Sequence, residues 1–341
     1  MMKILVTGGA GFIGSALIKQ WLHEDPRVEI VNFDKLTYSG DLWRLKSIEN
    51  NPRYRFFKGD VARPEDVDKA IEGCTGVIHA AAETHVDRSL LDSRTFLETN
   101  IYGTQVLLEA ARKKSVKRFL LVSTDEVYGS RDTTGSFKET DRLSPSSPYS
   151  VSKASADLLT FSYAHTHGMD ALVTRGSNTY GSFQYPEKVI PLFVTNALSN
   201  QSLPLYGDGK QIRNWLHVED HARAIRHVFR KGKKGEAYNI ASKVSLTNID
   251  LTRRLLKILN KPDSLIKRVT DRLGHDRRYA IDSSKLRALG WKEKFVFDEA
   301  FLHTVLWYRD NEKWWKAIKE KSAEFRRYYD LAYTSRLKKR R

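Results

Sequence analysis

The first half of the chain alternates short apolar segments with longer amphipathic ones, and this pattern limits the possible folds more than any other feature. Strands that alternate with helices of this length form βαβ units, in which right-handed crossovers join parallel strands. The sequence therefore predicts an α/β fold built on a doubly wound parallel sheet. The predicted strands cover residues 3–7, 28–33, 54–58, 76–80, 118–123 and 171–175, and the predicted helices cover 12–22, 66–72, 95–113 and 148–166.

The alternation ends near residue 176, where loops rich in glycine and proline begin to separate shorter elements. We interpret residues 1–176 as a dinucleotide-binding domain and residues 177–330 as a smaller C-terminal lobe that binds the substrate. A segment near 215–240 is expected to return to the first domain. Residues 331–341 end in a run of lysines and arginines and are expected to form a basic tail.

A glycine-rich turn lies between the first predicted strand and the first predicted helix, with glycines at Gly8, Gly11 and Gly14. Such glycines let the backbone approach a pyrophosphate, and the N–H groups at the start of the helix bind phosphate oxygens. Asp34 stands at the end of the second predicted strand, where a carboxylate can bind ribose hydroxyls and would repel a 2′-phosphate. The sequence therefore predicts a Rossmann-type site that prefers NAD over NADP.

Tyr149 and Lys153 stand four residues apart in the predicted helix 148–166, so their side chains share one face. A free tyrosine has a pKa of about 10, and a neighbouring positive charge favours its phenolate. Such a pair can take a proton from a hydroxyl group, as dehydrogenases and epimerases require. Asp125 and Glu126 follow the fifth predicted strand and supply a further acid and base, which an enzyme that eliminates water needs.

The amino-acid composition limits the classes of protein to which this chain can belong. Hydrophobic residues make up 40% of the chain, which indicates a globular protein. No apolar stretch is long enough to span a membrane and no signal peptide is evident, so we expect a cytoplasmic protein without a membrane partner. Cys74 is the only cysteine, which excludes an intrachain disulfide. His275 has no metal-ligand partner at a useful spacing, so no metal site is expected.

The formal net charge of +17 allows two kinds of partner. One is a nucleic acid or another polyanion, and the other is a small molecule that carries phosphates. The sequence contains no nucleic-acid recognition motif, whereas it contains a dense set of candidate enzyme residues. We therefore expect a phosphate-bearing small molecule and no nucleic acid. A polyanion-binding protein remains the alternative outside the enzymes.

These features resemble the extended short-chain dehydrogenase/reductases, and within them the dTDP-glucose 4,6-dehydratases. The resemblance covers nearly the whole chain. It implies an NAD-dependent lyase of deoxysugar biosynthesis, including that of rhamnose, which converts dTDP-glucose to dTDP-4-keto-6-deoxyglucose. The segments that carry it are GGAGFIG (8–14), AAETHVDRS (81–89), STDEVYG (123–129), YSVSK (149–153), YPEKVIPLF (185–193), LPLYGDGKQIRNWLHVEDHARA (203–224) and GHDRRYAID (274–282).

The resemblance also implies a catalytic role for each of five residues. Tyr149 removes the proton of the sugar C4 hydroxyl while hydride leaves C4, and Lys153 favours the phenolate and holds the nicotinamide ribose. Thr124 binds the C4 oxygen. Glu126 then removes the C5 proton, Asp125 protonates the departing C6 hydroxyl, and hydride returns to C6.

Binding residues follow from the same motifs. An acid at Asp60 can meet the adenine amine, and small side chains at 80–82 let a cofactor approach the backbone. The expected cofactor-binding residues are Gly8, Gly11, Phe12, Ile13, Gly14, Asp34, Lys35, Thr37, Asp60, Val61, Ala80, Ala81, Ala82, Thr99, Tyr149, Lys153 and Thr179. The expected substrate-binding residues are Thr84, Thr124, Asn178, Lys188, Val189, Pro204, Tyr206, Arg213, Asn248, Arg272 and His275.

Two alternative enzymes and one assembly remain open at this point. A UDP-glucose 4,6-dehydratase differs only in the base that it recognises, and a nucleotide-sugar 4-epimerase uses the same tyrosine, lysine and NAD without elimination.

Related enzymes pair two long helices from each subunit, which implies a homodimer here. The apolar stripes expected at that contact are Phe96, Val106, Leu107 and Ala110 on one helix and Leu158, Leu159, Phe161 and Ala164 on the other.

Overall fold

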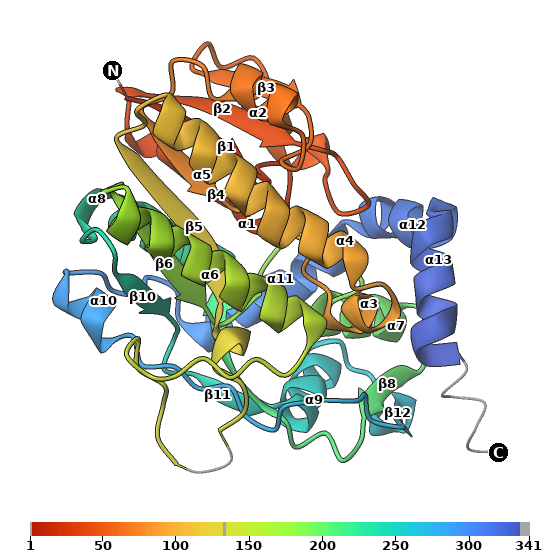
Figure 1. The fold of residues 1–341 in the computed structure, drawn as a ribbon. Coiled ribbons are helices and arrows are strands. Elements are labelled where there is room, and N and C mark those ends of the chain that lie inside the picture. The colour runs from red at the N-terminus through yellow and green to blue at the C-terminus, as the bar shows by residue number, and fades with distance from the viewer. Residues whose placement is uncertain (1, 132–133, 335–341) are drawn as a thin grey trace.

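A computed structural model shows the fold of the chain and describes residues 2–131 and 134–334 (Figure 1). Its largest sheet has seven parallel strands in the order β10-β6-β5-β4-β1-β2-β3. The chain builds this sheet outward from β1 in both directions, so the predicted doubly wound parallel fold is confirmed. The strands are β1 (Met2–Thr7), β2 (Val28–Asp34), β3 (Tyr54–Lys58), β4 (Gly76–His79), β5 (Arg118–Thr124), β6 (Ala171–Gly176) and β10 (Ala237–Ile240).

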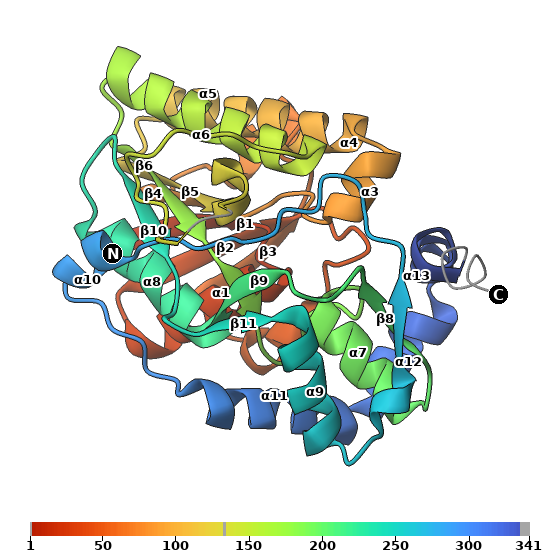
Figure 2. The ribbon, with the colours of Figure 1, turned by 90° about the horizontal axis from the view of Figure 1, so that it is seen from below.

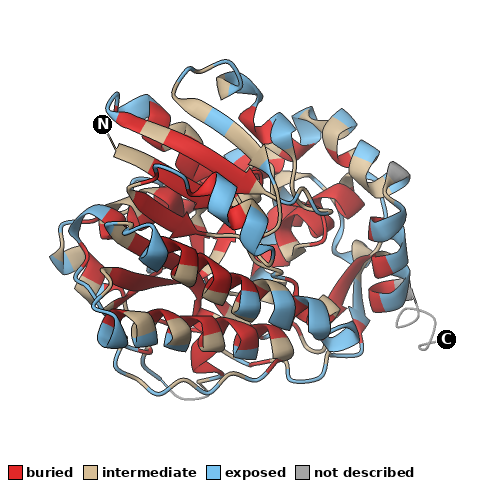
Figure 3. Ribbon diagram, turned by 45° about the horizontal axis from the view of Figure 1, so that its top comes forward, coloured by how far each residue is buried: buried red, intermediate tan, exposed pale blue. Residues whose placement is uncertain are grey.

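Helices cover both faces of this sheet (Figures 1 and 2). One face packs against α1 (Phe12–Glu24) and α8 (Val218–Lys231), which also contact each other. The other face packs against α2 (Pro64–Ala70), α5 (Gly103–Lys113) and α6 (Pro148–Thr166). Figure 3 shows the consequence, since the strands are buried while the outer faces of the helices are exposed. Burial on both faces explains why these strands are continuous apolar runs.

The predicted helix at 95–113 is interrupted. It consists of α4 (Arg94–Leu97), a π-helical turn (Glu98–Tyr102) and α5. The wider turn contains the buried Asn100, whose side chain accepts a hydrogen bond from the N–H of Glu83 and donates to the hydroxyl of Ser152 at 2.8 Å. These bonds join the segment after β4 to α6. Periodicity could not reveal the interruption because the apolar spacing continues through it.

A second lobe lies below the sheet in Figure 2 and has its own hydrophobic core. It contains a three-stranded sheet, β7 (Asn178–Tyr180), β9 (Ile212–His217) and β11 (Ser245–Thr247), and a parallel pair, β8 (Leu203–Tyr206) and β12 (Ile266–Val269). Its helices are α7 (Val189–Leu198), α9 (Asn248–Ile258), α11 (Phe297–Asp310), α12 (Glu312–Lys321) and α13 (Ala323–Tyr329). The remaining elements are the helices α3 (Val86–Leu91) and α10 (Ser284–Ala288), the 3₁₀ turns Leu42–Ile48, Asp125–Tyr128 and Asp263–Leu265, and a π-helical turn, Asp330–Thr334.

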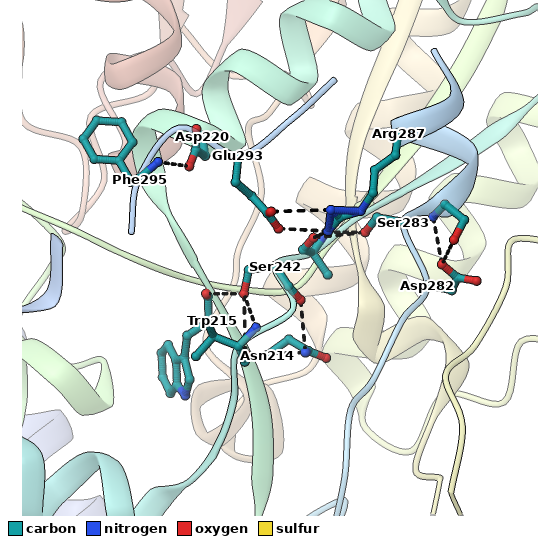
Figure 4. Close-up of polar contacts among 12 residues, drawn as sticks. Asn214, Trp215, Asp220, Ser242, Asp282, Ser283, Arg287, Glu293 and Phe295 are labelled. Atoms are coloured by element: carbon teal, nitrogen blue, oxygen red, sulfur yellow. Dashed lines mark hydrogen bonds and ion pairs between the residues drawn. The ribbon is translucent and has the colours of Figure 1, made fainter. Parts of the chain in front are cut away.

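The chain returns to the first domain through α8 and β10, and polar contacts fix this return (Figure 4). Near the start of α8, the carboxylate of Asp220 accepts hydrogen bonds from the main-chain N–H groups of Lys294 and Phe295, the latter at 3.0 Å. After β10, the hydroxyl of Ser242 donates to the carbonyl of Trp215 at 2.6 Å. Because these bonds satisfy buried groups of both lobes, they resist separation of the lobes.

The C-terminal end differs in part from the expected tail. Residues 331–334 lie in the last π-helical turn, where Ala332 and Tyr333 are buried in the core of the second lobe. The rest of the expected basic tail, 335–341, lies outside the described residues. No helix among the described residues is both long and apolar enough to cross a lipid bilayer.

Candidate active site

A cavity of about 340 Å³ opens where the first domain meets the second lobe. It lies at the carboxyl ends of six parallel strands, with Gly8 after β1, Asp34 at the end of β2 and Thr124 at the end of β5. A smaller cavity of about 160 Å³ adjoins it and shares Glu126 and Lys188 among its lining residues. Every residue predicted to bind cofactor or substrate or to act in catalysis lines one of these cavities, except Asp125 and Lys153.

The glycine-rich turn has the shape of a dinucleotide cradle. Gly8 has a φ of +69°, and a Cβ there would lie 2.6 Å from the main-chain nitrogen of Ala81. A Cβ on Gly14 would collide with the carbonyl oxygen of Gly8. Helix α1 begins after Gly11 without a side-chain cap or an acidic residue in its first turn, and Phe12 and Ile13 line the cavity there. Its N-terminus can therefore bind an anion such as a pyrophosphate.

Asp34 is held at the end of β2 in a defined orientation. Its carboxylate accepts hydrogen bonds from the main-chain N–H of Ala10 at 2.9 Å and of Leu36 at 2.8 Å. Leu36 has a positive φ of 55°, which turns the chain sharply after the strand. The carboxylate also lines the cavity, so it can accept the hydroxyls of a ribose. These residues fit NAD.

Tyr149 and Lys153 lie in the first two turns of α6, which begins with a reciprocal pair of hydrogen bonds between Ser147 and Ser150. Both side chains are buried. The Lys153 ammonium donates to the carbonyl of Val122 in β5 at 2.8 Å. Burial lowers the pKa of Lys153 to about 8. Most Lys153 side chains are therefore charged at neutral pH, one helical turn after Tyr149.

Burial raises the pKa of Tyr149 well above its ordinary value, and the negative charge of Glu126 adds to this rise. A hydrogen bond with Thr124 acts in the opposite direction. The phenol is therefore the stable form of Tyr149 in the protein alone. It needs further positive charge nearby before it can act as a base.

The two acids lie in the 3₁₀ turn that follows β5. The hydroxyl of Thr124 accepts from the N–H of Glu126 at 3.3 Å and fixes the start of the turn. Asp125 is buried, and its Oδ1 contacts the Thr124 hydroxyl at 3.3 Å. Its Oδ2 has no hydrogen-bond partner among the described residues. Glu126 points elsewhere, since it lines both cavities and its Oε2 accepts from the hydroxyl of Tyr279 at 3.4 Å.

The surroundings separate the two acids in their affinity for a proton. Burial raises the pKa of Asp125 to about 8, and the charge of Glu126 adds to the rise. Burial also raises the pKa of Glu126, but the positive charges of Arg272 and Arg213 oppose that rise. Asp125 therefore carries a proton on most molecules at neutral pH. Two neighbouring carboxyl groups in such different environments can act as an acid and a base.

The smaller cavity brings together the predicted substrate-binding residues of the second lobe. Arg213 donates to the carbonyl of Asp276 at 2.9 Å, and its guanidinium lies 4.1 Å from the centre of the Tyr279 ring. The Nε of Arg272 is buried without a hydrogen-bond partner among the described residues. Two guanidinium groups at one cavity suit a ligand with a pyrophosphate. The other residues of the set at this cavity are Thr84, Asn178, Lys188, Val189, Pro204, Tyr206, Asn248 and His275.

Several lining residues had no role in the sequence analysis. Glu187 and Tyr279 stand inside recognised segments and could have been found there by their position next to Lys188 and near His275. Arg44 and Tyr333 come from segments without a motif, so no sequence signal placed them at the site. Glu187 accepts from the hydroxyl of Tyr38 at 2.9 Å. Tyr333 stacks on Tyr206 with ring centres 5.8 Å apart and becomes a wall of the smaller cavity.

Comparison with known proteins identifies the family. Residues 5–304 match the model of the GDP-mannose 4,6-dehydratase family. A dTDP-glucose 4,6-dehydratase from Actinoplanes sp. is 48% identical over 92% of this chain and all of that protein. A dTDP-glucose 4,6-dehydratase from Streptomyces venezuelae, solved with NAD and TYD bound, is 45% identical with a TM-score of 0.91 and covers 93% of this chain and 100% of that one.

A UDP-glucose 4-epimerase from Thermus thermophilus, solved with NAD, shares the fold at 28% identity and a TM-score of 0.84, covering 91% of this chain and 100% of that one. The two dehydratases are therefore more similar to this chain than that epimerase is. The chain belongs to the dTDP-glucose 4,6-dehydratases, within the extended short-chain dehydrogenase/reductases and the GDP-mannose 4,6-dehydratase family. The resemblance predicted from the motifs is confirmed.

The environment of Asp125 predicts an unusual titration. A protonated carboxyl group should persist through neutral pH and disappear with a midpoint near pH 8, because burial disfavours its charged form. Infrared difference spectra across neutral and alkaline pH should show this signal in the unmodified protein and lose it in Asp125→Asn. The exposed Asp92 serves as a control, since Asp92→Asn should leave the signal in place. If Asp125 is already ionised in mildly acidic solution, the electrostatics described above are wrong.

Proposed function

We propose that this protein is a dTDP-glucose 4,6-dehydratase that uses NAD and releases dTDP-4-keto-6-deoxyglucose. The observation that carries the proposal is the pair of acids in the 3₁₀ turn after β5, where Glu126 lines both cavities and the buried Asp125 lies next to it, both close enough to Tyr149 for their charges to raise its pKa. A simple oxidation at C4 needs only the tyrosine and the lysine. Elimination across C5–C6 needs an acid and a base as well, and this site supplies both.

The larger cavity is suited to NAD, which when bound accepts a hydride from C4 of the sugar and gives it back at C6. Asp34 would hold a ribose, and the N–H groups at the start of α1 would hold the pyrophosphate. The absence of room for a Cβ at Gly8 and Gly14 supports this assignment. Asp60 would complete the adenine end, because its carboxylate lines the same cavity and pairs with Lys35 at 2.7 Å.

Tyr149 removes the proton from the C4 hydroxyl in this mechanism. The hydrogen bond with Thr124 and the charge of Lys153, one helical turn on, both favour the phenolate. Thr124 also holds the C4 oxygen. Because burial alone keeps Tyr149 protonated, loss of its proton is coupled to the arrival of positive charge and substrate.

Glu126 removes the C5 proton, and Asp125 gives its proton to the departing C6 hydroxyl. The cations beside Glu126 support the role of base, and the raised pKa of Asp125 supports the role of acid. Arg213 and Arg272 would bind the pyrophosphate of the nucleotide sugar, and Pro204 and Tyr206 would pack on its base.

Product analysis tests the proposal directly. The purified protein should convert dTDP-glucose to the 4-keto-6-deoxy product without added reductant, because the hydride is returned within the same active site. The same assay with UDP-glucose measures the choice of base, where one methyl group is worth about 1–3 kcal/mol. A 4-epimerase would instead form dTDP-galactose. NADH that accumulates in step with product would contradict the internal return of hydride.

Substitution of the acids separates oxidation from elimination. Glu126→Gln and Asp125→Asn each remove a positioned base or acid and should slow elimination by about 10²–10⁴-fold. Tyr149 and Lys153 stay intact, so both variants should still oxidise C4 and develop NADH absorbance when substrate is added. Tyr149→Phe is the matched control and should lose both steps. If oxidation falls as far as turnover in the acid variants, the proposed roles are wrong.

We also infer that the protein forms a homodimer, although not through the stripes expected from the sequence. Phe96, Val106, Leu107, Ala110 and Ala164 are buried within their own subunit, and Leu159 and Phe161 are half-buried. Phe96 packs against Val86 and Tyr149, and the other side chains cover the parent sheet, as the inner faces of amphipathic helices do. Of the predicted set only Leu158 is exposed.

Another group of exposed apolar side chains supports the dimer. Adjacent elements carry them, since α6 contacts α3, α4 and the π-helical turn between α4 and α5. An apolar surface of this kind, spread over neighbouring elements, is typical of a protein–protein contact. Its residues are Leu90, Leu91, Leu97, Tyr102, Val151 and Leu158.

Leu158→Glu should therefore weaken the dimer, because it places a charge in the proposed contact at one of its two most exposed residues. Light scattering should give about twice the chain mass of 39.2 kDa for the unmodified protein and a lower mass for the variant. Leu302→Glu, at an exposed leucine on α11, is the control and should leave the mass unchanged. A monomeric unmodified protein at micromolar concentration would overturn the proposal.

A further inference from the structure

Arg44 is a buried cation at the larger cavity. It belongs to the 3₁₀ turn Leu42–Ile48, which follows the loop after β2, and only 2% of its surface is exposed. It nevertheless lines the cavity that contains the glycine-rich turn. No motif in the sequence pointed to it.

The guanidinium of Arg44 binds main-chain carbonyls from three separate segments. It donates to Ala10 in the glycine-rich turn at 2.9 Å, to Ser39 in the loop after β2 at 2.7 Å, and to Phe183 in the second lobe at 3.1 Å. It therefore lies where the phosphate-binding turn, the ribose-binding loop and the second lobe meet.

The positive charge of Arg44 has no ion-pair partner within the described part of the chain. The carboxylates of Asp34 and Asp41 influence it from a distance. Each of them accepts hydrogen bonds elsewhere, Asp34 from two main-chain N–H groups and Asp41 from Trp43 and Trp314. A buried charge without a paired partner is costly, so an anion bound in the adjoining cavity would be stabilised by Arg44.

The anion that fits this position is a pyrophosphate. Ala10, whose carbonyl Arg44 binds, stands two residues before helix α1, and phosphates bind at helix N-termini of this kind. We infer that Arg44 is an additional cofactor-binding residue, whose guanidinium supplies the counter-charge for the pyrophosphate of the dinucleotide. The inference rests on the proposed use of NAD and adds a residue that the glycine-rich motif does not contain.

A purely structural role is the competing explanation, because Arg44 joins three segments by hydrogen bonds. Arg53 provides a matched control for it. The guanidinium of Arg53 also binds three main-chain carbonyls, those of Leu22, Asp25 and Val28. Arg53 lies just before β3, at the opposite edge of the sheet from the cavities, and lines neither of them. Its loss removes the same kind of bonds without removing charge from the site.

The experiment compares two competitors on the same protein. The protein is loaded with NADH, and nicotinamide fluorescence follows its displacement by ADP, which carries the pyrophosphate, and by adenosine, which does not. The midpoint for adenosine divided by the midpoint for ADP reports recognition of the pyrophosphate. This ratio does not depend on the affinity for NADH. A charged hydrogen bond of this kind should make the ratio about 10-fold smaller in Arg44→Met than in the unmodified protein.

Arg44→Lys keeps the charge, so its ratio should lie between those of Arg44→Met and the unmodified protein. Arg53→Met should have the same ratio as the unmodified protein. Equal weakening of ADP and adenosine in Arg44→Met would show that Arg44 only supports the loops, and would overturn the inference. An unchanged ratio with unchanged midpoints would overturn it as well. If the unmodified protein itself fails to bind NADH, the proposed cofactor is wrong, and this result is distinct from the others.

Discussion

The site depends on one geometric constraint, which is that parallel strands end at the same edge of their sheet. Each crossover helix returns the chain to the opposite edge, so the residues that follow the strands gather without being close in sequence. Gly8 after β1, Asp34 at the end of β2 and Thr124 at the end of β5 meet in this way at the larger cavity. The second lobe then closes that edge and adds most of the residues that line the smaller cavity.

Burial governs the chemistry of this edge. Removal of water raises the pKa of Asp125 and of Tyr149 and lowers that of Lys153, because each change favours the uncharged form. Burial raises the pKa of Glu126 too, but the positive charges of Arg272 and Arg213 in the second lobe oppose that rise. The site therefore holds an acid that keeps its proton beside a second carboxyl group whose charged form is favoured by nearby cations. Binding of charged ligands can change this balance further.

Ion pairs join the first domain to the second lobe and its C-terminal helices beside the smaller cavity. Arg88 in α3 pairs with Glu187 at 3.0 Å and with Glu324 in α13 at 2.7 Å, and Tyr333 stacks on Tyr206. The end of the chain is thus part of the wall of the smaller cavity. This arrangement builds the surroundings of the smaller cavity from residues that lie more than half the chain apart in sequence.

The sequence by itself determined the alternating α/β fold, the glycine-rich turn and the two catalytic motifs, because each depends on local spacing. Helix α6 has the predicted bounds, and Tyr149 and Lys153 share the expected face. Only the tertiary structure decided which apolar residues remain exposed, since both faces of α6 are partly apolar and packing on the sheet selects between them. It also decided that Arg44 reaches the larger cavity and that Tyr333 becomes a wall of the smaller one. No periodicity marks those residues, because long-range packing alone brings them to the site.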